Sequence, residues 1–290
     1  MAECSGGTAV CDVCPHRCRI AEGKTGRCRA RGAVNGRVVP LNYGIVRSLA
    51  LDPIEKKPLS RFFPGSRILS VGSFGCNLNC PFCQNWEISM SDGREYLHGG
   101  RAQDHFLSPE VLADMAEQLR DRGNIGLAFT YNEPLISYEY VLDTARILRE
   151  KNMKSVVVTN GCFREETARK VLPAVDALNI DLKCFRDEVY RTTLGGDLET
   201  VKSFIALAAE RCHVELTCLI VPGMNDSEEE IRAMTRWIRS LPGGEEIPLH
   251  ITRFFPRYRL TDRNPTERRT VLRLAEAAGQ ELKYVFPGNL

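Results

Sequence analysis

The chain has 290 residues, of which 43% are apolar and 26% are charged, and this composition excludes a disordered or fibrous protein. Its length fits one large α/β domain or two small ones. The 39 basic and 37 acidic side chains leave a formal net charge of +2, so no overall field gathers nucleic acid or anionic lipid.

The first residues lack the basic and apolar regions of a signal peptide. No apolar run approaches the roughly 20 residues that a membrane-spanning helix needs. We therefore expect a soluble, cytoplasmic protein without a membrane partner.

Residues 1–66 are rich in Cys, Gly and Arg, and we predict that they form a small accessory domain. Residues 37–46 look like a small β unit. Four cysteines with the spacing C-x2-C-x3-C-x9-C supply enough thiolates to close a metal site: Cys11, Cys14, Cys18 and Cys28. Either a tetrahedral zinc ion or an auxiliary 4Fe–4S cluster fits four thiolates, and the spacing does not distinguish them.

From residue 67 onward, short β-branched runs alternate with longer helical patterns, which is typical of a parallel sheet with crossover helices. Strands are expected at 67–74, 125–130, 154–159, 177–182, 213–221 and 247–254, with 282–286 as a further candidate. Helices are expected at 109–122, after the N-cap residue Ser108, and at 228–240, capped by Asn225 or Asp226. This pattern predicts an α/β fold with a partial (β/α)6 barrel over residues 67–290, whose site lies at the carboxyl ends of the strands.

Three cysteines directly follow the first of these strands, with the spacing C-x3-C-x2-C: Cys76, Cys80 and Cys83. Three thiolates on one short loop can each bind one iron of a 4Fe–4S cube. The fourth iron then keeps an open coordination position that invites a chelating ligand. The alternative is a structural zinc loop that borrows a fourth ligand from elsewhere.

This loop resembles that of the radical S-adenosylmethionine (SAM) superfamily, C-x3-C-x-aromatic-C, with Phe82 at the aromatic position. Other segments resemble the branch that contains the pyruvate formate-lyase activating enzymes: 72–87, 128–134, 157–161, 178–185, 219–226 and 249–256. Within this branch, residues 52–59 and 80–86 are similar to the radical SAM enzyme of the AmmeMemoRadiSam system.

The resemblance implies that the open iron binds the amino and carboxylate groups of SAM and that an electron from the cluster breaks the C5′–S bond. A 5′-deoxyadenosyl radical then abstracts hydrogen from an unidentified substrate. An oxidoreductase of this kind needs a reductant such as ferredoxin or flavodoxin, and the resemblance suggests the other AmmeMemoRadiSam proteins as partners. The cofactor carries the hard chemistry, so the protein has to place it and exclude water.

Polar residues at the ends of the following strands are the expected cofactor ligands. Glu133 ends the second strand, and the resemblance implies that its carboxylate accepts hydrogen bonds from the methionine ammonium. The family usually has Gly-Gly-Glu-Pro here, and Asn132 replaces the second glycine. The alternative for Glu133 is an unpaired surface carboxylate. Asn160 ends the third strand and offers both a donor and an acceptor to a carboxylate or a ribose.

Strand alternation puts Asp181 and Lys183 on one face of the fourth strand. The resemblance implies that they contact the ribose and the carboxylate of SAM, while the alternative is an internal ion pair. His250 in the sixth strand matches a position that borders the active site in the branch, although a lone histidine in an apolar strand is also typical of a satisfied core residue. The complete set of expected cofactor-binding side chains is Phe82, Asn132, Glu133, Asn160, Asp181, Lys183 and His250.

Two other functions stay open at this point. The first is activation of a glycyl radical enzyme, which needs a groove for a protein loop rather than a closed pocket. The second is a non-enzymatic zinc-binding module that recruits nucleic acid. This second function leaves the three-cysteine loop and the shared face of Asp181 and Lys183 unexplained.

Overall fold

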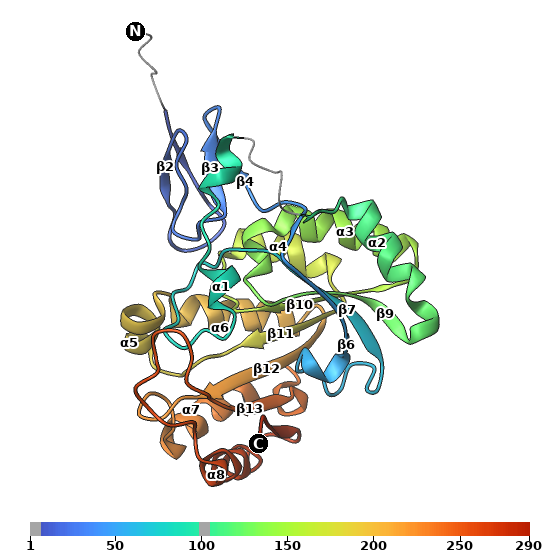
Figure 1. Ribbon diagram of the computed structural model, residues 1–290. Helices are drawn as coiled ribbons and strands as arrows, with labels where there is room; N and C mark the ends of the chain where they lie inside the picture. Colours follow the sequence, from blue (N-terminus) through green and yellow to red (C-terminus); the bar gives the residue numbers. More distant parts are fainter. Residues whose placement is uncertain (1–6, 99–104) are drawn as a thin grey trace.

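Figure 1 shows a computed structural model of the chain, which describes residues 7–98 and 105–290. The strands are β1 Thr8–Val10, β2 Arg19–Ala21, β3 Arg31–Val34, β4 Arg37–Pro40, β5 Ile45–Val46, β6 Ser48–Pro53, β7 Arg67–Gly72, β8 His105–Phe106, β9 Asn124–Phe129, β10 Lys154–Thr159, β11 Ala177–Asp181, β12 His213–Ile220, β13 Leu249–Arg253 and β14 Val285–Gly288. The helices are α1 Trp86–Ser89, α2 Pro109–Gln118, α3 Tyr138–Glu150, α4 Glu165–Val171, α5 Asp187–Val189, α6 Leu198–Ala209, α7 Glu228–Arg239 and α8 Arg268–Ala278.

Eight strands form one sheet in the order β14-β13-β12-β11-β10-β9-β7-β6. Every neighbouring pair is parallel except β6 and β7. The helices that connect the strands cover the outer face of this curved sheet (Figure 1), which confirms the predicted α/β fold with a partial barrel. Strand β10 has the predicted bounds, and the candidate at 282–286 is β14, shifted toward the C-terminus.

The hydrophobic core lies between the sheet and these helices. Aliphatic side chains of the inner strands, such as Val156 and Leu178, have no exposed surface. Helix α6 faces them with an apolar stripe that repeats every three or four residues, including Val201, Phe204 and Ala208. Burial on both faces explains why these strands are nearly continuous apolar runs in the sequence.

The sheet extends into the segment that the sequence assigned to the accessory domain. Strand β6 pairs with β7 in antiparallel register, from Ser48 opposite Gly72 to Pro53 opposite Arg67. The sheet therefore begins before residue 67, where we expected its start. As an edge strand, β6 is only partly buried and lacks a regular alternation of buried and exposed residues, so it gave no strand pattern. A domain division at residue 66 stays a prediction.

Two short antiparallel strand pairs, β1–β2 and β3–β4, stand beyond one end of the sheet (blue in Figure 1). The β3–β4 pair is closed by Asn35 and Gly36, whose φ angles of 52° and 72° match the turn that suits strand twist. The carboxylate of Glu22 accepts hydrogen bonds from both turn amides, at 2.7 and 3.0 Å. The predicted β unit at 37–46 is divided, because β4 pairs with β3 whereas β5 pairs with β8.

The start of helix α2 is as predicted, since Ser108 Oγ accepts a hydrogen bond from the Val111 amide at 3.3 Å. The helix ends at Gln118, before the predicted end, because a tighter turn follows and Gly123 ends it with a φ of 82°. The predicted cap of α7 is wrong. Ser227 accepts the hydrogen bond from the Glu230 amide, at 3.2 Å, and neither Asn225 nor Asp226 does so.

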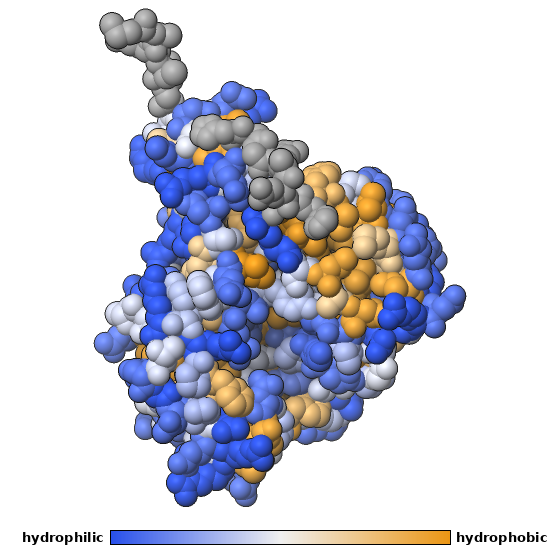
Figure 2. Space-filling model, viewed as in Figure 1, coloured by the Kyte–Doolittle hydropathy of each residue, from blue (hydrophilic) through white to orange (hydrophobic). Residues whose placement is uncertain are grey.

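None of the helices in the described parts of the chain combines the length and the apolarity needed to cross a membrane. Figure 2 shows a mainly hydrophilic face with an apolar patch on the side of α2 and α3. Phe106 of β8 and Val111 of α2 are among the large apolar side chains that stay exposed.

Candidate active site

The three-cysteine loop leaves the carboxyl end of β7 through a glycine that no other residue replaces without strain. Gly75 has a φ of 86°, and a Cβ atom there would lie 2.6 Å from Ala30 Cβ and 2.7 Å from the Cys28 carbonyl oxygen. The loop thus packs directly against the N-terminal segment. Within it, the Leu78 amide lies 3.4 Å from Cys76 Sγ and donates a hydrogen bond to the sulfur.

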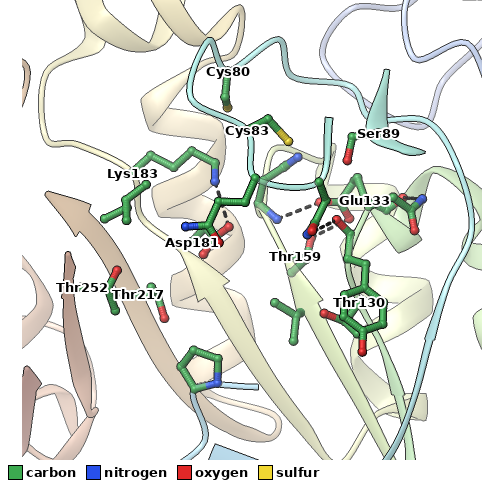
Figure 3. Close-up of a pocket in the computed structure, with 18 of the residues that line it drawn as sticks. Cys80, Cys83, Ser89, Thr130, Glu133, Thr159, Asp181, Lys183, Thr217 and Thr252 are labelled. Atoms are coloured by element: carbon green, nitrogen blue, oxygen red, sulfur yellow. Dashed lines mark hydrogen bonds and ion pairs between the residues drawn. The ribbon is translucent and has the colours of Figure 1, made fainter. Parts of the chain in front are cut away.

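A pocket of about 620 Å³ lies at the carboxyl ends of the strands, where the fold predicts the functional site. It is lined by all ten side chains predicted for the cluster and for SAM: Cys76, Cys80, Phe82, Cys83, Asn132, Glu133, Asn160, Asp181, Lys183 and His250. Figure 3 shows Cys80 and Cys83 on their loop, with Lys183 and Asp181 on one side and Glu133 on the other. Residues from the cluster loop and from four other strands or strand ends therefore meet in one place.

The donor set at one end of this pocket fits a 4Fe–4S cluster with an open iron. Three thiols from a single loop line the pocket, and no other described cysteine does. Burial raises the pKa of Cys80 to about 11, although the Lys183 ammonium lowers it, and burial beside Glu133 raises the pKa of Cys76. Such thiols ionise when a metal centre binds, because the metal replaces the proton.

Glu133 is buried, with 2% of its surface exposed, so the alternative of an unpaired surface carboxylate is wrong. Its carboxylate accepts hydrogen bonds from the Leu135 amide at 3.0 Å, from Thr159 Oγ1 at 2.8 Å and from the Asn160 amide at 2.8 Å. Burial raises the pKa of Glu133 to about 7, and these hydrogen bonds oppose the increase. A cationic ligand in the pocket would stabilise the carboxylate form.

The two residues that replace the family's glycines both have structural partners. Tyr131 takes a φ of 71°, a conformation that favours glycine, and its hydroxyl donates to Asp52 at 2.9 Å. The side chain of Asn132 accepts from the Ser73 amide at 2.9 Å and donates to the Phe74 carbonyl at 3.0 Å. Asn132 thus joins the end of β9 to the start of the cluster loop.

Asn160 also holds the cluster loop, because its side-chain amide donates to Asn77 Oδ1 at 2.8 Å and approaches Cys76 Sγ at 3.7 Å. On the next strand, Lys183 Nζ lies 2.8 Å from Asp181 Oδ2. The ion pair named as the alternative is therefore present, and both partners line the pocket. Burial alone would lower the pKa of Lys183, but Asp181 and the Cys80 sulfur raise it well above its ordinary value.

His250 combines both roles that the sequence left open, since it is buried in the barrel and also lines the pocket. Its Nε2 lies 2.7 Å from the carboxylate of Glu215, which has no exposed side-chain surface. Glu215 also lies 3.0 Å from His213 Nε2 and accepts from the amides of Ser60 and Arg61 at 2.9 and 2.7 Å. The sequence reasoning missed Glu215, although a charged residue inside an apolar strand is a detectable signal.

Asn225, expected to be a helix cap, ties the end of β12 to the site. Its side chain accepts from the Val221 amide at 2.7 Å and donates to the Lys183 carbonyl at 2.7 Å. The backbone of Lys183 is thereby fixed from the far side of the strand.

The other cysteine group lies in the N-terminal segment, away from this pocket. Cys11, Cys14, Cys18 and Cys28 line a separate small cavity of about 10 Å³. Within the described residues, no three His, Cys, Asp or Glu side chains lie close enough together to hold one metal ion between them.

The sequence pattern of the Radical SAM superfamily matches residues 70–237, which include the cluster loop and the strands around the pocket. The chain belongs to the radical SAM superfamily. It is therefore an enzyme of that class, and membership implies a 4Fe–4S cluster and SAM as cofactors. The alternative of a non-enzymatic zinc-binding module is wrong.

Among its relatives, the uncharacterized protein MJ0808 of Methanocaldococcus jannaschii is 40% identical over 284 residues, which are 97% of this chain and 81% of that protein. A pyruvate formate-lyase-activating enzyme of Clostridium pasteurianum is 26% identical over 192 residues, covering 64% of this chain and 75% of that enzyme. The crystal structure of QueE from Escherichia coli aligns with a TM-score of 0.52 and 11% sequence identity, covering 84% of this chain and 93% of QueE. This similarity shows a shared fold.

Proposed function

We propose that this chain binds a 4Fe–4S cluster through Cys76, Cys80 and Cys83, binds SAM beside it, and cleaves SAM reductively to abstract hydrogen from a substrate. The observation that carries this proposal is the shared pocket, because residues far apart in the sequence supply both a three-thiol loop and paired charges. When bound, the cluster supplies the electron, and SAM supplies the hydrogen-abstracting adenosyl group.

The side chains of this pocket offer complementary partners for each part of SAM. Glu133 accepts hydrogen bonds from the methionine ammonium, since a buried carboxylate near a cation gives a charge-assisted bond. Lys183 donates to the methionine carboxylate, and Asp181 accepts from the ribose hydroxyls. Phe82 has only 3% of its surface exposed, and its ring excludes water next to the cysteines.

The substrate side of the pocket is lined by the segment that resembles the AmmeMemoRadiSam enzyme, including Pro53, Glu55, Lys56 and Pro58. This segment is fixed from behind, because Asp52 accepts from the buried Lys57 at 2.9 Å as well as from Tyr131. We propose that the substrate, which belongs to the AmmeMemoRadiSam system, meets Glu55 and Lys56 on this fixed segment. Ferredoxin or flavodoxin is the proposed reductant, and a cytoplasmic location stays part of the proposal.

Activation of a glycyl radical enzyme is the second candidate. Its support is the similarity to proteins named as activating enzymes, including an isethionate sulfite-lyase activating enzyme of Desulfovibrio desulfuricans, 28% identical over 145 residues. That alignment covers 48% of this chain and 46% of the relative. A glycyl radical enzyme gene beside this one would favour the activase.

The test of the proposed reaction is anaerobic reconstitution with iron and sulfide, followed by reduction in the presence of SAM. We expect 5′-deoxyadenosine and methionine as products, detected by chromatography. A fully loaded and reduced cluster that leaves SAM intact would contradict the proposal.

Replacing Asp181 with Asn or Lys183 with Met should weaken SAM binding by about ten- to a hundredfold. A lost charge-assisted hydrogen bond is worth roughly 1.5–3 kcal/mol, which corresponds to this range. The absorption of the cluster should stay unchanged, because neither side chain is a cluster ligand. Equilibrium binding of SAM to the reconstituted variants measures the effect.

The matched control is Lys154→Met, which breaks a 3.1 Å ion pair with Asp176 at the opposite end of the barrel strands. It should bind SAM normally. If the Asp181 and Lys183 variants also bound SAM normally and only melted at lower temperature, the pair would be purely structural.

A further inference from the structure

The four N-terminal cysteines converge on a cavity that the proposed SAM reaction does not use. Cys11, Cys14 and Cys28 are buried, Cys18 is half-buried, and all four line the same space of about 10 Å³. Apolar side chains, including Ile20 and Ile136, close it off. The sulfurs come from the β1–β2 connection and from the turn before β3, so the cavity joins both strand pairs of the segment.

A backbone amide faces this group of sulfurs, because the Arg27 amide donates a hydrogen bond to Cys18 Sγ at 3.4 Å. Amide donors stabilise thiolates, and a cysteine that only fills the core does not need them.

Arg31 lines the cavity beside the four cysteines, and so does His16. The guanidinium of Arg31 lies nearby but is already bound to Glu139 at 2.7 Å. Four cysteines that line one small cavity, with an amide donor at Cys18, are the chemistry of a site for a thiophilic metal.

We propose that Cys11, Cys14, Cys18 and Cys28 bind a metal centre that is separate from the SAM-binding cluster and stabilises the N-terminal segment. Four thiolates fit either an iron–sulfur cluster, whose irons each take one thiolate, or a tetrahedral zinc ion. The proposal goes beyond SAM cleavage and does not depend on it.

The position of this centre explains why the segment needs one. Its sheets are pairs of strands of three or four residues, too short to bury much core. It nevertheless supports the catalytic loop, because His16 Nε2 lies 2.9 Å from the Asn77 carbonyl oxygen and the Cys28 carbonyl packs on Gly75. A rigid segment at this place fixes the back of the cluster loop.

Metal analysis of the intact protein is the first test, with iron, zinc and acid-labile sulfide counted per chain after anaerobic purification and reconstitution. About four irons with one zinc, or about eight irons, would each support the second centre and would identify its metal. Four irons without zinc would overturn the proposal.

The second test uses the double variant Cys14→Ala, Cys18→Ala, with Cys212→Ala as the control because that cysteine lies outside both groups. The double variant should lose one zinc or about four irons, keep the absorption of the remaining cluster, and lose hydrogen-exchange protection in residues 7–40. The control should keep all metal. An unchanged metal content in the double variant, or loss of all iron from a variant that is still folded, would contradict a separate centre.

Discussion

Changing Cys76, Cys80 or Cys83 to Ala is expected to abolish SAM cleavage in each variant separately. Each thiolate binds a different iron, so the loss of any one leaves too few ligands to hold the cube. The three sulfurs also line the pocket together with the proposed SAM ligands, so a displaced cluster could not be compensated from nearby cysteines. Iron and sulfide content, together with 5′-deoxyadenosine formation under reducing conditions, measures the effect.

The control for these variants is again Cys212→Ala, which should keep its iron and its turnover. Asn160 and Asn132 hold the loop through hydrogen bonds to Asn77 Oδ1 and to the Phe74 carbonyl, neither of which involves a mutated sulfur. The variants should therefore stay folded, as measured by circular dichroism. Wild-type turnover in any one of the three would remove the basis for assigning the cluster to this loop.

The change Glu215→Gln is expected to lower the free energy of unfolding at pH 7 by about 3 kcal/mol. Burial alone would raise the pKa of Glu215, but His213, His250 and the amides of Arg61 and Ser60 lower it from 4.5 to about 2. Each unit of pKa shift corresponds to about 1.4 kcal/mol of differential stability. Urea unfolding of both proteins measures the difference.

The sign of the pH dependence follows from the lowered pKa. The stabilisation is fully present above the unfolded value near 4.5 and is lost as the pH falls toward 2, so the two proteins should converge in acid. Glu229→Gln, at an exposed position on α7, removes the same charge and should change stability little. Equal stability of wild type and Glu215→Gln at pH 7 would show that burial of the carboxylate cancels its hydrogen bonds.

The barrel was predictable because its strands are buried on both faces and therefore read as apolar runs separated by helical patterns. The edge strand β6 was not, since it is short and only partly buried. Position along the strands also predicted that these side chains come together, because parallel strands bring their carboxyl ends to one edge of the sheet. Glu133, Asn160 and Asp181 therefore line one pocket, while their roles in binding SAM stay a prediction.

What the sequence did not predict depends on partners that are distant along the chain. Glu215 accepts hydrogen bonds from the backbone amides of Ser60 and Arg61, which lie 155 and 154 residues earlier in the chain. Asn225 looked like a helix cap, because asparagine often caps helices. In the structure its side-chain amide instead donates a hydrogen bond to the Lys183 carbonyl. Local sequence patterns indicate secondary structure, whereas the roles of Glu215 and Asn225 arise from tertiary contacts.

The two ends of the sheet order, β6 and β14, give the pocket a property that a closed barrel lacks. Both edges contribute to its wall, through Pro53 at the end of β6 and through Gly288 in β14, yet the sheet does not join them by strand pairing. Side chains bridge this seam instead, with Arg61 Nη2 donating to the Tyr284 hydroxyl at 3.1 Å and stacking over its ring at 4.0 Å. The amides of Ser60 and Arg61 cross to the same side through the buried carboxylate of Glu215 on β12, so separating the two edges would break buried hydrogen bonds although it would break no strand ladder.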